Sequence, residues 1–239
     1  MNRIDGRRTD ALRPVEIETD YLKFAEGSCL ITCGNTRVLC AASVEERIPP
    51  HVASGCGWVT AEYSMLPRAN RQRSRRDIDK LKIAGRSAEI QRLIGRSLRA
   101  AIDLSKLGER TLTIDCDVLQ GDGGTRTASV TGGFVAMALA CKKMLRDGLI
   151  DEMPIQGYLA AVSAGIVDNT PMLDLCYEED SHAMVDLNCV MTEQMQIVEI
   201  QGTGEGRAFS VQESQSLISL CAKGIRELIE KQKAVIGDL

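Results

Sequence analysis

The stretch 115–132 holds residue types that suit an anion-binding site. Strand-like apolar residues end in acids and glycines, and a helix of small residues follows. The three glycines within 121–124 allow the backbone to approach a ligand closely. Thr125 adds a hydroxyl and Arg126 a planar cation, while the helix start adds free N–H groups and a positive dipole end. The combination favours phosphate; a turn whose glycines serve only backbone geometry is the alternative.

Arg86 is a second candidate for anion binding. It lies in Ala84-Gly-Arg-Ser87, at the predicted start of a helix, where the helix dipole disfavours a cation. A bound anion would offset that cost. An ordinary surface arginine is the alternative.

Asp180 and Asp186 are candidate catalytic acids. Asp186 lies between Val185 and Leu187, so strand alternation places its side chain on the face opposite to theirs. Two carboxylates at a cleft would share a Mg²⁺ ion through oxygen ligands, or one would protonate a leaving oxygen. A solvated acidic loop is the alternative.

An arginine-rich segment, 68–76, is a candidate RNA contact. It holds five arginines within nine positions, although the net charge of the chain is −4. Each arginine that neutralises a phosphate of single-stranded RNA contributes about −0.7 to the salt dependence of binding. Because aromatic residues make up only 3% of the chain, RNA would be held through phosphates rather than by base stacking. A solvated or partner-pairing loop is the alternative.

Composition and periodicity predict an α+β protein of one large domain or two fused halves. The chain has 239 residues and 44% apolar content, enough for a substantial core. No apolar stretch approaches a membrane span, and the polar N-terminus lacks a signal-peptide core. Nine scattered cysteines with no CxxC pair favour buried free thiols. We therefore expect a cytoplasmic protein.

The predicted elements follow the same order in both halves, with strands preceding helices. Strands are predicted within 14–48, with a hairpin at Cys33-Gly-Asn-Thr36, and over 57–65, 110–119, 157–167, 172–177, 183–192 and 195–201. A second hairpin is predicted around Asp168-Asn-Thr-Pro171, between the strands over 157–167 and 172–177. Helices are predicted over 84–103, 126–146 and 210–236, and a loop over 68–82.

Several sequence blocks together resemble the ribonuclease PH family of phosphorolytic tRNA 3′-end nucleases. The resemblance runs from about residue 8 to 232, and its blocks are 57–68, 84–96, 115–132, 179–188 and 199–206. It implies a ribonuclease-PH-type fold, with helices packed on mixed β-sheets. It further implies one domain over 1–239, built of two pseudo-repeated halves at about 10–150 and 151–236.

The resemblance also implies roles for the candidate residues. Phosphate is expected at Arg86, Gly124, Thr125 and Arg126. Asp180 and Asp186 are expected to be the essential acids and to hold Mg²⁺. The loop arginines Arg68, Arg73 and Arg76 are expected to bind RNA.

The activity implied is phosphate-dependent trimming of nucleotides after the CCA end of tRNA precursors, with release of nucleoside diphosphates. Inorganic phosphate is then a co-substrate, the reaction is reversible, and rRNA processing or RNA turnover is a further expected role. A homo-hexamer arranged as a trimer of dimers is the implied assembly. Neither DNA nor a membrane is expected as a partner.

Three other interpretations stay open at this point. An exosome-type ring subunit or half of a polynucleotide phosphorylase would be longer or need partner chains. A non-catalytic RNA-binding ring subunit would lack the phosphate arginines or the acids. A small-molecule kinase would need a P-loop, and the chain has no Gly-x-x-x-x-Gly-Lys-Ser/Thr sequence.

Overall fold

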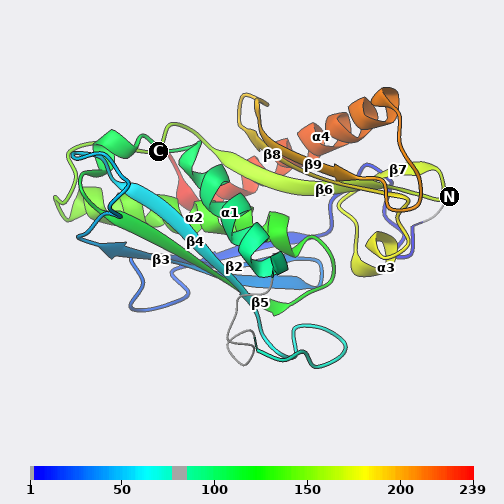
Figure 1. The fold of residues 1–239 in the computed structure, drawn as a ribbon, viewed down its shortest axis with the longest axis horizontal. Coiled ribbons are helices and arrows are strands. Elements are labelled where there is room, and N and C mark those ends of the chain that lie inside the picture. Colours follow the sequence, from blue (N-terminus) through cyan, green and yellow to red (C-terminus); the bar gives the residue numbers. More distant parts are fainter. Residues whose placement is uncertain (1–2, 77–84) are drawn as a thin grey trace.

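Two β-sheets and the long helix between them form the framework of the protein (Figure 1). The computed structural model describes residues 3–76 and 85–239. The first sheet has the strand order β1-β2-β3-β5-β4 and the second the order β7-β6-β8-β9. The first sheet contains β1 (Val15–Thr19), β2 (Gly27–Cys33), β3 (Thr36–Glu45), β4 (Trp58–Met65) and β5 (Thr111–Gln120). The second contains β6 (Leu159–Val167), β7 (Thr170–Leu173), β8 (Val185–Thr192) and β9 (Ile197–Thr203).

Helices lie between strands, as well as after them, in both halves of the chain. They are α1 (Gly85–Arg99), the 3₁₀ helix η2 (Leu104–Leu107), α2 (Thr125–Arg146), α3 (Tyr177–Asp180) and α4 (Val211–Ile236). The α+β class is confirmed. The first sheet is mixed, because β4 runs parallel to β5, whereas all pairs in the second sheet are antiparallel.

Helix α2 is the centre of the core. It packs on β2, β3 and β5 of the first sheet and on β6 and β8 of the second. A Cβ atom at Gly132 would lie 2.7 Å from the Ile31 side chain and 2.8 Å from Cys40 Sγ, so the glycine lets this helix lie directly on the sheet. Contrary to the sequence expectation, α2 is long and apolar enough to cross a membrane, but 78% of its most apolar window is buried within the protein. Its apolarity is therefore accounted for by the core.

Both predicted hairpins are present. Cys33 pairs with Thr36 across a two-residue turn, and Val167 pairs with Thr170 across Asp168 and Asn169. Asp168 and Asn169 both have positive φ, at 47° and 59°, as a type I′ turn requires. Seven of the nine cysteines are buried, as expected of small apolar core residues.

Two predicted element boundaries are wrong, and both corrections bear on the site. The predicted strand over 172–177 ends at Leu173, where Asp174 takes a positive φ of 53° and the chain turns into α3. The predicted helix over 84–103 ends at Arg99, and the Asp103 side chain caps η2. Residue 84 and the part of the predicted loop over 77–82 lie outside the described residues.

Candidate active site

The glycine-rich turn joins β5 to the N-terminus of α2. Gly123 and Gly124 both have positive φ, at 79° and 65°, and Gly124 is the N-cap residue of α2. A Cβ atom at Gly123 would lie 2.5 Å from the Leu175 carbonyl oxygen, so the turn touches the segment that leads into α3. The first amide N–H groups of a helix have no partner within it. The turn therefore offers backbone donors to an anion, as the sequence predicts.

Arg126 lies in the first turn of α2 and is held by two other elements. Its Nη1 donates to Gln201 Oε1 of β9 at 2.9 Å and lies 3.5 Å from Glu89 Oε1 of α1. The Arg126 side chain is 18% exposed. A partly desolvated guanidinium with fixed orientation suits recognition of a phosphate group.

Arg86 is the second residue of α1 and is exposed. The positive charges of Arg86 and Arg126 both act on Asp180, where they partly offset the rise in carboxyl pKa that burial causes. They also act on the phenol of Tyr63. The two arginines therefore both lie within electrostatic reach of Asp180 and Tyr63, although they come from different helices.

The hydroxyl of Thr125 has a partner that the sequence analysis did not identify. Thr125 is buried, and its Oγ1 lies 2.9 Å from the hydroxyl of Tyr63 on β4. Tyr63 itself is only 3% exposed, and burial raises the pKa of its hydroxyl. The pair fixes the first residue of α2 against the first sheet, so the backbone N–H of Thr125 is positioned together with its side chain.

Asp180 is the last residue of α3, the short helix that the sequence did not predict. Asp180 is exposed. Desolvation by the surrounding protein nevertheless raises the pKa of its carboxyl, and the nearby charges of Arg86 and Arg126 oppose that shift. The Asp180 carboxyl is thus within electrostatic reach of Arg86 and Arg126, the two arginines predicted to bind phosphate.

Asp186 is the second residue of β8 and behaves as the alternation predicts. Val185 and Leu187 are buried, while Asp186 is half-buried. Desolvation raises the pKa of Asp186 to about 6, and the neighbouring Asp180 carboxylate adds to the shift. The charge of Arg126 and a hydrogen bond from Asn188 Nδ2 at 3.0 Å act in the opposite direction. Perturbed carboxyls next to cations are common at functional sites.

The predicted phosphate residues and the predicted acids therefore form one cluster. Its members come from α1, the start of α2, the end of α3 and the start of β8. Glu205, which follows β9, adds a negative charge that raises the pKa of both Asp180 and Asp186. The arrangement places two cations beside two partly desolvated carboxylates, which suits a reaction between anionic groups.

The arginine-rich loop 68–76 borders this cluster. The Gly121 N–H of the glycine-rich turn donates to the Ala69 carbonyl at 2.9 Å. Arg71 pairs with Glu178 of α3 at 3.2 Å, with the two side chains 79% and 48% exposed. The three arginines predicted to contact RNA, Arg68, Arg73 and Arg76, are all exposed. The base of the loop is thus fixed to the turn, and its arginines face solvent.

Several supporting residues could not be assigned from the sequence. Tyr63, Glu89 and Gln201 lie inside the blocks that carry the family resemblance, but nothing in their spacing assigns them a contact. Within residues 3–76 and 85–239, no side-chain hydrogen bond or ion pair joins His182 to Asp180 or Asp186. Its ring Nδ1 lies 2.8 Å from the Glu178 carbonyl oxygen, and the side chain is exposed.

The candidate metal ligands are the two carboxylates of Asp180 and Asp186. Among residues 3–76 and 85–239, no group of three or more His, Cys, Asp or Glu side chains is arranged to hold a metal ion. Asp180 and Asp186 are two carboxylates close enough for one to raise the pKa of the other. Such a pair suits Mg²⁺, which is commonly held by one or two carboxylates together with substrate phosphates and waters.

Comparison with known families identifies the chain. The model of domain 1 of the 3′ exoribonuclease family matches residues 11–143, and that of domain 2 matches residues 157–223. The chain belongs to the 3′ exoribonuclease family. Ribonuclease PH of Bacillus subtilis (strain 168) is 57% identical over 238 residues, which cover 99% of this chain and 97% of the relative. Ribonuclease PH of Moorella thermoacetica is 54% identical over 240 residues, covering 100% of this chain and 96% of the relative.

Solved structures of the family share this fold. An Archaeoglobus fulgidus exosome with RNA bound to the active site matches with a TM-score of 0.83 at 26% identity, over 96% of this chain and 92% of the matched one. An archaeal exosome core matches with a TM-score of 0.77 at 24% identity, over 97% of this chain and 91% of the matched one. The ribonuclease-PH-type fold predicted from the sequence is confirmed.

Proposed function

We propose that the chain is a phosphate-dependent 3′-to-5′ exoribonuclease that trims the 3′ ends of tRNA precursors. One observation carries the proposal: Arg126 lies within electrostatic reach of both acids, Asp180 and Asp186, and Arg86 lies within electrostatic reach of Asp180. The full-length similarity to ribonuclease PH supports the same activity. A non-catalytic RNA-binding subunit would not need this complete set of groups.

In the proposed reaction, an oxygen of inorganic phosphate attacks the last phosphodiester phosphorus of the RNA. The bond from that phosphorus to the 3′ oxygen of the preceding nucleotide breaks, and this oxygen takes up a proton. The products are a nucleoside diphosphate and an RNA shortened by one nucleotide. Because a phosphodiester is exchanged for a phosphoanhydride, the reaction is nearly balanced and also runs in reverse, adding nucleotides from diphosphates.

The residues of the chain contribute mainly positioning and charge neutralisation. Arg86, Arg126, the Thr125 hydroxyl and the backbone N–H groups of 124–126 hold the attacking phosphate. The hydrogen bond from Arg126 to Gln201 and the contact of Thr125 with Tyr63 keep these donors in place. Arg68, Arg73 and Arg76 hold the RNA backbone.

Asp180 and Asp186 are proposed to hold Mg²⁺. A bound Mg²⁺ ion would offset negative charge on the scissile phosphate. A second role for Asp186, as proton donor to the departing 3′ oxygen, is supported by its pKa of about 6. The two roles differ in pH dependence, because a metal ligand must be deprotonated and a proton donor must be protonated. Activity that rises with pH through about 6 supports the ligand role, and activity that falls there supports the donor role.

The wider setting is proposed on the family relationship. We propose a homo-hexameric ring built as a trimer of dimers, action after the CCA end of tRNA, a further role in rRNA processing or RNA turnover, and a cytoplasmic location. Two solved structures that share the fold are described as an exosome with RNA bound to the active site and as an exosome core. Size-exclusion chromatography with light scattering tests the ring directly.

The test of the activity uses a tRNA that carries a short 3′ extension. The purified protein is incubated with this RNA and Mg²⁺, with and without inorganic phosphate, and the released nucleotides are identified. Nucleoside diphosphates that appear only with phosphate are the expected result. Monophosphates released without phosphate would mean hydrolysis, and bound RNA with no release would mean a non-catalytic subunit.

A further inference from the structure

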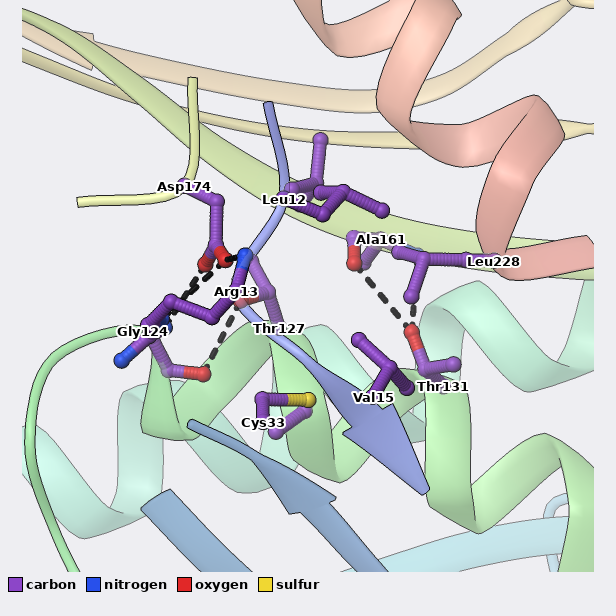
Figure 2. Close-up of a pocket in the computed structure, with 12 residues that line it drawn as sticks. Leu12, Arg13, Val15, Cys33, Gly124, Thr127, Thr131, Ala161, Asp174 and Leu228 are labelled. Atoms are coloured by element: carbon purple, nitrogen blue, oxygen red, sulfur yellow. Dashed lines mark hydrogen bonds and ion pairs between the residues drawn. The ribbon is translucent and has the colours of Figure 1, made fainter. Parts of the chain in front are cut away.

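Arg13 donates hydrogen bonds to both the glycine-rich turn and the segment before α3. Figure 2 shows its pairing with Asp174. The residue is only 4% exposed. Its Nε and Nη2 donate to the two carboxylate oxygens of Asp174, at 3.0 Å and 2.6 Å, and its backbone N–H donates to the same carboxylate at 2.8 Å. Nη1 donates to the Asp122 carbonyl at 2.5 Å, and Nη2 also reaches the Gly123 carbonyl at 3.4 Å. One guanidinium thus contacts both the glycine-rich turn and the segment before α3.

Asp174, which accepts hydrogen bonds from Arg13, lies in the segment that leads to Asp180. Asp174 is 6% exposed, with a positive φ of 53°. It lies between β7 and α3, which ends at Asp180. A non-glycine residue keeps this backbone conformation only where its surroundings hold it. The bidentate pairing with Arg13 supplies such a constraint at the point where the chain turns toward Asp180.

The hydrogen bonds from Arg13 to the glycine-rich turn fix the direction of backbone groups in that turn. The Gly123 carbonyl accepts from Thr36 Oγ1 at 2.7 Å as well as from Arg13, and Thr36 Oγ1 accepts from the Asp122 N–H at 2.9 Å. In a trans peptide the C=O and the following N–H point in opposite directions, and none of the described peptide bonds is cis. Because the carbonyls of Asp122 and Gly123 face Arg13, the N–H groups of Gly123 and Gly124 face away from it.

The packing of Arg13 against the turn leaves little room for adjustment. A Cβ atom at Gly124 would lie 3.0 Å from Arg13 Nη2. The positive charge of Arg13 is paired with the negative charge of Asp174, so the connection adds little net charge to the site. The contribution of Arg13 is therefore geometric. It sets the position of the backbone N–H groups of the turn relative to the segment that carries Asp180.

We infer that Arg13 is a positioning residue that sets the affinity for the attacking phosphate by fixing the glycine-rich turn to the segment that carries Asp180. The inference rests on the proposed function, since it names a residue that acts through the phosphate donors of that site. Arg13 does not touch the reacting atoms. A lysine at position 13 would keep the charge but lose the planar fork that binds the carboxylate and the two carbonyls together.

The chain offers a matched control for an ordinary buried ion pair. Arg3 is also buried, and its Nε donates to Glu179 Oε1 at 2.8 Å. Its Nη2 also donates to Glu179 Oε2 at 2.5 Å. Its remaining hydrogen bonds in the described structure go to carbonyls of Arg8, Ala11, Leu173 and Asp174, and none goes to the glycine-rich turn. Replacing Arg3 therefore disturbs the segment around Asp174 and Glu179 but breaks no hydrogen bond to the glycine-rich turn.

The test compares Arg13→Lys with Arg3→Lys in the full-length protein. Steady-state kinetics give the KM for inorganic phosphate and kcat at saturating phosphate, and thermal unfolding gives the loss of stability. We expect Arg13→Lys to raise the phosphate KM about tenfold, while RNA affinity stays within about twofold of wild type. Arg3→Lys is expected to lower the melting temperature yet leave the phosphate KM within about twofold. An unchanged phosphate KM in Arg13→Lys, or an equal rise in both variants, would overturn the inference.

A second variant and a second measurement keep the test decisive. Thr36→Val removes the other hydrogen bond to the Gly123 carbonyl, and we expect it to raise the phosphate KM severalfold even if Arg13→Lys fails to fold. Inorganic phosphate should raise the melting temperature of the wild type, because it binds the folded state, and raise that of Arg13→Lys or Thr36→Val less. Equal shifts in all folded proteins would contradict the inference. A wild type that releases no nucleotide with phosphate would instead contradict the proposed function.

Discussion

Two arginine-bearing segments border the candidate site, and they are held in different ways. In the glycine-rich turn and the start of α2, Arg126 is partly buried and bonded to Gln201. In the loop 68–76 the arginines are exposed, and the ion pair of Arg71 with Glu178 is open to solvent. Fixed, partly desolvated donors suit binding a phosphate in one orientation, whereas exposed cations give a screened attraction for a polyanion. The difference separates a catalytic role from an RNA-holding role.

The largest expected effect is at Arg126. Arg126→Ala should lower phosphate-dependent trimming on the order of a thousandfold, because it removes a positioned cation from the attacking phosphate. The loss of its hydrogen bond should cost about 1 kcal/mol of stability, so the fold is retained. Initial rates of nucleotide release and circular dichroism measure the two effects.

The control for that substitution lies on the same helix. Arg146 is the last residue of α2 and its side chain is 73% exposed. Arg146→Ala should trim RNA at the wild-type rate. Equal loss of activity in both variants would remove the distinction between the positioned arginine and an ordinary surface arginine.

The second prediction concerns Asp186, one of the two candidate acids. Asp186→Asn should lower turnover strongly and leave RNA affinity unchanged. It should also stabilise the metal-free protein, because the folded state raises the pKa of Asp186 from 3.8 to about 6. The ionised carboxyl therefore opposes folding above that range, by at most about 3 kcal/mol for a shift of about two units.

The pH dependence of unfolding tests whether the ionised Asp186 carboxyl destabilises the folded protein. The stability penalty grows as the pH rises from 3.8 to about 6 and disappears below that window, where the carboxyl is protonated in both states. Thermal unfolding with a chelator should therefore show a more stable Asp186→Asn variant at about pH 7.5 and equal stabilities at about pH 3. Reduced stability of the variant at the higher pH would contradict the desolvated carboxyl described here.

The loop arginines should affect binding rather than chemistry. Replacing Arg68, Arg73 and Arg76 by alanine should weaken RNA binding and reduce the slope of log affinity against log salt by about 0.7 for each phosphate that is no longer neutralised. The rate at saturating RNA should change little. Filter binding across a salt series measures the slope, and an unchanged slope would exclude these arginines from the RNA-binding surface.

The smallest expected effect is at Arg71. Arg71→Ala breaks the exposed ion pair with Glu178 and removes the guanidinium that lies 5.8 Å from the centre of the Tyr177 ring. Exposed interactions of these two kinds contribute about 0–1 kcal/mol each. We expect a change in unfolding free energy within about 0.5 kcal/mol. A loss as large as that of a buried pair would mean that the loop is held more firmly than its exposure indicates.

The sequence predicts the elements of the fold better than the contacts that assemble the site. Strand alternation correctly places Asp186 on the face opposite Val185 and Leu187, and the turn residues correctly indicate both hairpins. The helix α3 is missed because it has only four residues, too few for a helical periodicity. It begins only after Asp174 takes a positive φ.

The supporting contacts are missed for a different physical reason. Arg13 and Asp174 are 161 positions apart, and Arg126 and Gln201 are 75 apart. Local spacing indicates which face a side chain occupies but not which distant residue lies opposite it. Sheet order and the packing of α2 between the sheets decide these pairings.

In the proposed mechanism, the glycine-rich turn and Arg126 hold the phosphate that attacks the RNA. The most direct measurement supplies radiolabelled inorganic phosphate with a 3′-extended tRNA and follows the label into released nucleotides, for the wild type and for Arg126→Ala. We predict label in the β-phosphate of nucleoside diphosphates from the wild type, and almost none from the variant. Unlabelled monophosphates from the wild type, or labelled diphosphates from the variant at the wild-type rate, would contradict the claim.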